Sequence, residues 1–122
     1  MKNLSDIRIC ITKREMRVLK EVLKRVDSNL LSVCDSINEF IGQDGLRYVF
    51  LSWKNIEWFK SYVDIWFIES LLIDFKKKNI PFNFIRIGRN GDIEHKFCYD
   101  TKFVIDTGMI LQMLINMKSR RN

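Results

Sequence analysis

The fold is decided around residues 81–98, which read PFNFIRIGRNGDIEHKFC. Two stretches in it are typical of short strands, and they flank Asn90-Gly91, the dipeptide that best tolerates the positive φ angles of a tight turn. We therefore predict a β-hairpin with a two-residue loop. Such a loop sets up these opposed pairs: Arg86 with His95, Phe84 with Phe97, and Phe82 with Tyr99.

Side chains alternate between the two faces of a strand, so this hairpin has one aromatic and basic face. Phe82, Phe84 and Arg86 lie on it, whereas Ile85 and Ile87 lie on the other face. Rings beside a fixed positive charge can stack a base and hold a phosphate. Two interpretations stay open: the rings belong to the core, or they face a ligand.

Length and composition predict one folded domain spanning residues 1–122. Hydrophobic residues make up 47% of the chain, which argues against disorder. No apolar run approaches the roughly 18–20 residues that span a bilayer. The polar start of the chain lacks the apolar segment of a secretory signal. We therefore expect a cytoplasmic protein with no membrane partner.

The cysteines and the histidine argue against a metal site. The chain has three Cys and one His, without a Cys-x-x-Cys pair. Cys10, Cys34 and Cys98 are expected to be buried thiols in a reducing compartment.

The net charge of +6 is concentrated in residues 1–25, which hold eight Lys or Arg and three acidic residues. A basic excess suggests an anionic partner, namely a nucleic acid, a nucleotide or an acidic protein. The strongest basic ridge is formed by Arg17, Lys20 and Lys24 on the polar side of a predicted helix.

Periodicity and capping signals predict the remaining elements. Thr12 and Glu15 form a capping-box pattern at the start of a helix. The expected order begins with a strand over Ile7–Ile11 and a helix from Thr12 to Ile41, which Asp27-Ser28-Asn29 could bend or split. A strand over Leu46–Leu51, an aromatic connection over Ser52–Tyr62 and a helix over Ile65–Lys78 capped by Asp64 come next. The hairpin follows, then a strand over Lys102–Ile105 and an apolar segment over Met109–Met117 that fits a helix or a strand. This order predicts an α+β fold with a mostly antiparallel sheet and helices packed on one side.

Catalytic motifs are scarce. His95 has no Cys or Ser partner in a known catalytic motif. The glycines around Arg89 and Asn90 lie in a hairpin with no helix after it, so they do not form a Gly-rich phosphate-binding loop. Asp92 and Glu94 share one strand face but lie next to a turn, where acids are usually solvated. The sequence therefore favours binding over catalysis, with no cofactor.

A second group of candidate binding residues lies between residues 53 and 62, where Trp53, Trp58, Phe59 and Tyr62 follow one another closely. Trp and Tyr prefer sites where one end of the ring meets a polar partner. The group suits a ligand site, a hydrophobic cluster under a loop, or a dimer interface.

Several of these motifs together resemble a known family. The stretch Ile56-Glu57-Trp58-Phe59-Lys60-Ser61-Tyr62, followed by Phe84-Ile85-Arg86-Ile87-Gly88 and Asp92-Ile93-Glu94, is similar to small phage proteins of the first type of Thoeris anti-defence family. The likeness covers roughly residues 46–106. The chain departs from it at Arg89-Asn90, where more acidic residues are expected.

The resemblance implies a phage protein that sequesters an immune signal in the infected bacterial host and does not cleave it. The ligand would be a cyclic ADP-ribose isomer made by an enzyme with a Toll/interleukin-receptor domain, and some members also take cyclic oligonucleotides. It also implies a homodimer or higher homo-oligomer with pockets near the subunit interface. The candidate ligand-binding residues are Phe82, Phe84, Arg86, Arg89, Asn90, Asp92, Trp58 and Tyr62.

Three alternatives remain. A nucleic-acid-binding protein would use the basic ridge and the tail at Lys118, Arg120 and Arg121 to contact phosphates. An inhibitor of a defence nuclease would dock through its aromatic segment. A phosphodiesterase acting on the same nucleotide would use His95.

Overall fold

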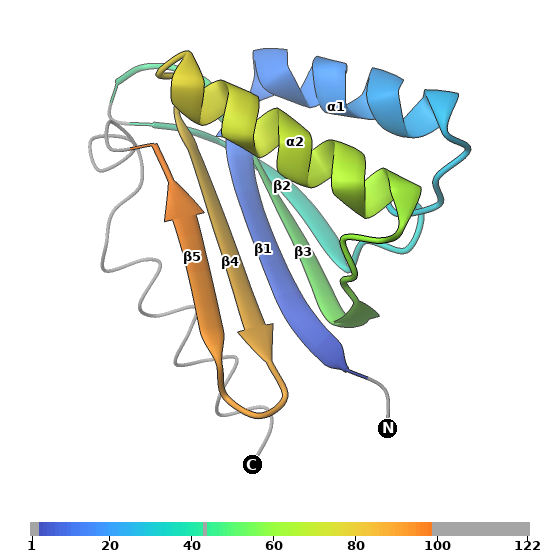
Figure 1. The fold of residues 1–122 in the computed structure, drawn as a ribbon. Helices are drawn as coiled ribbons and strands as arrows, with labels where there is room; N and C mark the ends of the chain where they lie inside the picture. The colour runs from blue at the N-terminus through green and yellow to red at the C-terminus, as the bar shows by residue number, and fades with distance from the viewer. Residues whose placement is uncertain (1–2, 43, 99–122) are drawn as a thin grey trace.

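The computed structural model describes residues 3–42 and 44–98, which form a five-stranded sheet with two helices (Figure 1). The predicted strand over Lys102–Ile105 and the segment Met109–Met117 lie outside these residues. The elements are β1 (Leu4–Thr12), α1 (Lys13–Arg25), β2 (Ser36–Ile41), β3 (Arg47–Glu57), α2 (Val63–Lys77), β4 (Phe82–Gly88) and β5 (Ile93–Phe97).

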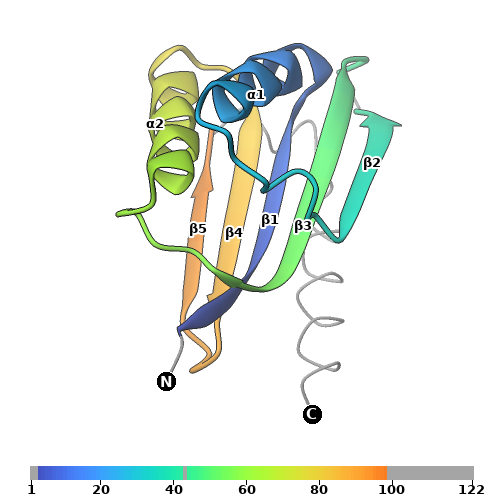
Figure 2. The same cartoon turned by 90° about the vertical axis from the view of Figure 1, so that its right-hand side faces the viewer.

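The sheet has the strand order β2-β3-β1-β4-β5, and every neighbouring pair is antiparallel. Both helices lie side by side on one face of it (Figure 2). The first six elements form two interlocked β-α-β units in the ferredoxin-like arrangement, and β5 extends the sheet beside β4. The predicted α+β class, antiparallel sheet and one-sided helices are confirmed.

The central strand β1 is the best predicted element. Ile7, Ile9 and Ile11 alternate along it and are at most 1% exposed, packed in the main core. Thr12 then caps α1, because its hydroxyl accepts the backbone N–H of Glu15 at 3.1 Å. The capping pattern correctly predicted where α1 begins.

The predicted helix up to Ile41 is wrong, because α1 ends at Arg25. Asp27 adopts a left-handed φ of 52°, and the N–H of Ser28 donates to the carbonyl of Leu23. This is the hydrogen bonding of a Schellman motif, which stops a helix. Of the apolar residues beyond it that keep a helical spacing, Leu30 and Val33 lie in the loop before β2. The others lie on the edge strand β2, since pairing with β3 decides their conformation.

Other boundaries also differ from the expected ones, and β1 begins at Leu4, ahead of the expected Ile7. The strand β3 runs from Arg47 to Glu57 and so takes in much of the segment expected to be a connection. Helix α2 begins at Val63. Tyr62 occupies the N-cap position before it, and its side chain makes no capping hydrogen bond. Asp64 therefore lies in the first turn of α2, where a carboxylate is stabilised by the helix dipole, and it is not the cap.

The hairpin exists, but its loop has three residues and its register differs by one. Gly88 pairs with Asp92 through a backbone hydrogen bond, and Gly91 has a φ of 89°. A type I turn followed by a left-handed residue produces such a loop. Phe84 consequently lies opposite Lys96, and Arg86 lies opposite Glu94. The expected pairs with Phe97 and His95 are wrong, because one residue of slip moves a side chain to the other face.

His95 lies on the sheet face away from the helices, where its Nε2 is 3.0 Å from Oδ1 of Asn83. Burial lowers the pKa of His95 below its ordinary value of 6.5. Between the folded and the unfolded pKa, His95 therefore binds a proton in the unfolded chain but not in the folded one. We expect the melting temperature to fall as the pH drops through about 6.5 and to level off below the folded pKa. Melts between pH 8 and pH 5 would measure this, and an equally steep fall in His95→Gln would contradict it.

Candidate functional site

The structure separates the predicted ligand-binding residues into three places. Phe82, Phe84 and Trp58 lie in the core between the sheet and the helices, at 1%, 0% and 7% exposure. Trp58 and Phe84 are ring neighbours with centroids 6.0 Å apart. A ring without an exposed face cannot stack a ligand base, so the core interpretation of the hairpin rings holds and the ligand-face interpretation is corrected.

The polar residues of the hairpin mostly bond to one another. Arg86 pairs with Asp92 across the loop and donates to the hydroxyl of Ser5. The guanidinium lowers the pKa of the Asp92 carboxyl. Asn90 accepts the backbone N–H of Asp92 at 3.2 Å and so shapes the turn. Arg86, Asn90 and Asp92 therefore have structural partners that hold the hairpin.

Arg89 and Tyr62 lie elsewhere. Arg89 reaches from the hairpin loop to Oδ1 of Asn55 at 3.4 Å. Tyr62 is 44% exposed and donates its hydroxyl proton to Glu57 at 3.1 Å. This hydrogen bond raises the pKa of Tyr62, since it favours the protonated phenol. Both Asn55 and Tyr62 line a cavity of about 410 Å³.

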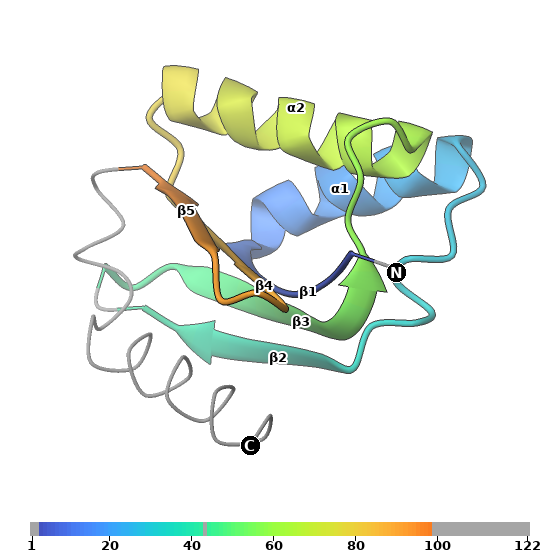
Figure 3. The same ribbon diagram turned by 60° about the horizontal axis from the view of Figure 1, so that its bottom comes forward.

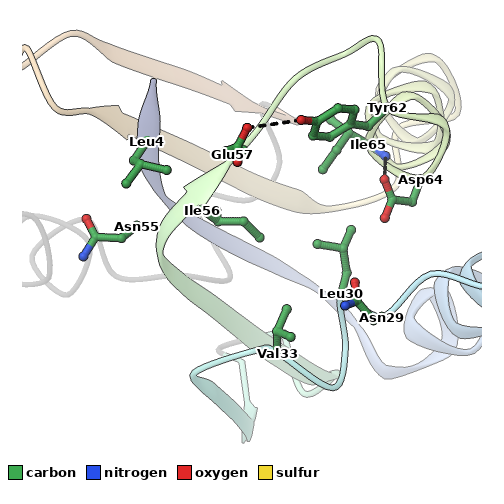
Figure 4. A pocket seen from close by; sticks show the side chains of 10 residues that line it. All are labelled: Leu4, Asn29, Leu30, Val33, Asn55, Ile56, Glu57, Tyr62, Asp64 and Ile65. Atoms are coloured by element: carbon green, nitrogen blue, oxygen red, sulfur yellow. Dashed lines mark hydrogen bonds between the residues drawn. The ribbon is translucent and has the colours of Figure 1, made fainter. Parts of the chain in front are cut away.

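The cavity lies where the start of β1, the end of β3, the α1–β2 loop and the start of α2 meet (Figure 4). Its apolar surface comes from aliphatic side chains of all four segments: Leu4, Leu30, Val33, Ile56 and Ile65. Its polar surface comes from two amides, two carboxylates and a phenol: Asn29, Asn55, Glu57, Asp64 and Tyr62. Ligand cavities of about 300–1,000 Å³ commonly have such an apolar lining with a few polar groups.

A β-bulge shapes the β3 side of the cavity. The pairing of β1 with β3 shifts by one residue between Ser5 and Ile7. Asn55 lies in this irregular part with a φ of 51°, which Asn tolerates better than most residues, and its N–H donates to Asp6 at 2.8 Å. The end of β3 bends toward the start of α2 (Figure 3). The bulge places Ile56 on the helix side of the sheet and leaves Asn55 at the rim.

Hydrogen bonds hold the other walls of the cavity. The hydroxyl of Ser28 donates to Asp64 at 2.8 Å, which joins the α1–β2 loop to α2. The indole N–H of Trp53 donates to the carbonyl of Leu30 at 2.8 Å. Both anchors link segments far apart in the sequence, so the cavity is largely preformed.

The chemistry of the lining suits binding. None of the described lining residues is a His, Cys, Ser, Lys or Arg, and Arg89 is held beside the rim by Asn55. The described residues also contain no group of three or more His, Cys, Asp or Glu that could hold a metal ion. The cavity thus offers apolar contact, an aromatic ring, and neutral and anionic hydrogen-bonding groups.

Sequence reasoning found Tyr62 and Arg89 but missed the amides and carboxylates of the cavity. Glu57 lies close to Tyr62 in the sequence, within the stretch 56–62 that carries the family resemblance, so its role as an acceptor could have been predicted. Asn29 and Asn55 had none, because only the fold brings them together. Of the three thiols, Cys10 and Cys98 are buried, as expected, whereas Cys34 is half-buried.

Comparison of the chain with protein-family models, with curated proteins and with solved structures finds no match. None of the described helices is long and apolar enough to cross a membrane.

Proposed function

We propose that the protein binds a small nucleotide of the cyclic ADP-ribose type in this cavity and holds it unchanged, as a phage anti-defence protein. The observation that supports this most is the composition of the cavity. An exposed phenol ring, two amides and several aliphatic side chains line a space of about 410 Å³. The resemblance to signal-sequestering proteins of the anti-Thoeris type points to the same class of ligand.

The base and the ribose match the lining. A base can lie over the aliphatic side chains and stack on Tyr62, because every base has a π-face. Amide side chains such as Asn29 and Asn55 can pair with the N6 and N7 edge of adenine. A carboxylate such as Glu57 is a common partner for ribose hydroxyls.

The phosphates of the ligand must point away from the carboxylates of the cavity. Glu57 and Asp64 repel an anion, so the diphosphate would point toward the Asn55 rim, where Arg89 stands. A guanidinium can bind phosphate oxygens through two parallel hydrogen bonds. The hydrogen bond from Arg89 to Asn55 is long, at 3.4 Å, so Arg89 can give it up to bind a phosphate.

Sequestration needs no reactive group in the cavity, and binding by stacking and hydrogen bonds leaves the ligand intact. Heat-denaturing the complex and measuring the mass of the released nucleotide tests this part of the proposal. Recovery of the intact nucleotide supports a sponge, and recovery of a hydrolysed product contradicts it.

Replacing Tyr62 by Ala is expected to weaken nucleotide binding by roughly 5- to 150-fold, because base stacking contributes about 1–3 kcal/mol. Tyr62→Phe keeps the ring and should retain most of the affinity. Calorimetric titration with cyclic ADP-ribose isomers measures both.

The matched control is Phe97→Ala, which removes a ring of similar exposure, 42%, that does not line the cavity. Its affinity should equal that of the parent. Equal affinities for the parent and Tyr62→Ala would contradict the placement of the base, and absence of binding by the parent would contradict the proposed ligand.

Nucleic-acid binding is a second candidate, supported by the outer side of α1. Arg14, Arg17, Lys20 and Lys24 are exposed there, and Arg14 also lines a cavity of about 330 Å³ with Lys13 and Arg47. Binding of this kind falls steeply with salt, with a log–log slope set by the number of phosphates contacted. A shallow slope for the small nucleotide and no retention of a DNA or RNA duplex would exclude it.

A further inference from the structure

The face of the sheet opposite the two helices is apolar at its centre. Because side chains alternate along a strand, every second residue of β1, β3 and β4 points to this face instead of the helix side. Neither of the two described helices lies over it, since both pack on the other face (Figure 2). The apolar residues at its centre are Cys10, Tyr48, Phe50, Ile85 and Ile87.

These side chains are nevertheless shielded from water. Tyr48 and Cys10 are 0% and 1% exposed, and Ile87 and Ile85 are 3% and 5% exposed. On a bare sheet face, neighbouring side chains shield only the flanks of a residue, and its outer end stays in contact with water. Burial also raises the pKa of the Cys10 thiol to about 12. The centre of this face is therefore covered by something other than the described helices.

The covered area is limited to the middle strands. On β5, at the edge of the same face, Ile93 and Phe97 are 48% and 42% exposed. The covered residues lie on β3, β1 and β4, which are neighbours in the sheet. Three strands spaced by about 4.8 Å span roughly 10 Å, and one helix with its side chains is about 10–12 Å wide. A single element packed across these strands is enough to cover them.

We propose that this face is the docking surface for the chain's own apolar segment Met109–Met117, which lies outside the described residues. Seven of its nine residues are apolar and none is charged. The two polar ones, Gln112 and Asn116, are four residues apart, so in a helix they would share one side and leave the rest apolar. Such a segment matches a surface of isoleucines, aromatic rings and a thiol, because it buries no charge there.

The chain after β5 is long enough to reach this surface. The described residues end at Cys98, whose N–H donates to the carbonyl of Phe82 at 3.3 Å, and the ten residues 99–108 separate it from Met109. Ten extended residues span up to about 33–36 Å. The path from β5 across β4 and β1 to β3 is three strand spacings, or roughly 15 Å. A tethered segment also has a high effective concentration, which favours it over a partner in solution.

Docking of this segment restricts how the protein could bind nucleic acid. Aromatic rings on an open sheet face can stack the bases of single-stranded RNA. Tyr48 and Phe50 lie on such a face, but under a docked segment they cannot stack a base. Nucleic-acid binding would then use the basic side of α1.

The three native thiols report on the docking. Cys10 lies under the proposed segment, Cys98 lies in the core on the helix side, and Cys34 is half-buried in the loop before β2. Brief alkylation followed by peptide mass spectrometry measures the labelling of each. In the parent we expect Cys34 to be labelled first and Cys10 to be protected as strongly as Cys98. Labelling of Cys10 as fast as in urea-unfolded protein would show a bare face and overturn the proposal.

A variant of the segment tests which element covers Cys10. Leu114→Asp should speed the labelling of Cys10 by roughly tenfold or more while Cys98 stays protected, because a charge in the apolar segment opposes docking. The matched control Gln112→Asp adds the same charge at a polar position and should leave Cys10 protected. Thermal melts establish that both variants are folded. A folded Leu114→Asp with parental protection of Cys10 would overturn the proposal.

Cross-linking decides the matter if Leu114→Asp unfolds. Met113→Cys, Leu114→Cys and Met117→Cys, each made alone in the full chain, place a thiol along the segment. After mild oxidation, at least one should form a disulfide with Cys10 within a single chain, as non-reducing electrophoresis and peptide mapping would show. The control Gln112→Cys should not form it. Links to Cys10 of another chain would assign the face to a second copy, and absence of any link would exclude the segment; either result overturns the proposal.

Discussion

Replacing Phe82 by Ala is expected to lower the free energy of unfolding by about 3–5 kcal/mol. The ring of Phe82 is 1% exposed, and it packs against Phe75 of α2 with centroids 6.4 Å apart. Its removal leaves a cavity at the contact between β4 and α2 that neighbours can fill only partly. Urea denaturation followed by tryptophan fluorescence measures the effect.

Phe97→Ala serves as the control, because its ring is 42% exposed on the neighbouring strand and its loss should change the unfolding free energy by less than about 1 kcal/mol. The nucleotide affinity of the folded fraction of Phe82→Ala should match that of the parent, since Phe82 does not line the cavity. A Phe82→Ala variant with parental stability and no nucleotide binding would reverse the assignment and restore this ring to a ligand site.

The second large effect is expected at the buried carboxylate of Glu69. Glu69 is 6% exposed and accepts hydrogen bonds from Trp58 at 2.9 Å and from Lys96 at 2.8 Å. Lys96→Met should destabilise the fold by on the order of 2 kcal/mol, because a buried carboxylate loses its counter-charge. The figure is below that of a fully buried pair, since the Lys96 side chain is 32% exposed.

A double variant makes this test specific. Adding Glu69→Gln to Lys96→Met removes the unpaired charge, while the amide oxygen still accepts from Trp58. We expect the double variant to be more stable than Lys96→Met alone, as a double-mutant cycle would report. Equal stability of the two would show that the unpaired Glu69 carboxylate costs nothing, which would contradict this explanation.

The same register that exposes Phe97 explains why the candidate site could be predicted only in part. A two-residue loop at Asn90-Gly91 and the observed three-residue loop fit the same local sequence. They differ in whether Phe84 faces Phe97 or Lys96. Only the observed register brings Lys96 to the helix side, where it reaches Glu69. Whether Phe97 is buried with Phe84 or exposed on the other face depends on this choice.

Local signals in the sequence were sufficient for elements whose conformation depends on near neighbours. The alternation of Ile7, Ile9 and Ile11 predicted β1, the Thr12 cap predicted the start of α1, and the apolar period predicted most of α2. The α+β class followed from their order. Alternation, capping and period are properties of a few consecutive residues, so one sequence is enough to read them.

Tertiary structure alone decided the rest. Pairing with β3 made residues 36–41 a strand despite their helical spacing, and the bulge at Asn55 shifted the pairing of the last residues of β3 with β1. The cavity joins Leu4, Asn29, Asn55 and Tyr62, which are far apart in the chain. Such arrangements depend on which long-range contacts bury the most apolar surface, and no local pattern records that choice.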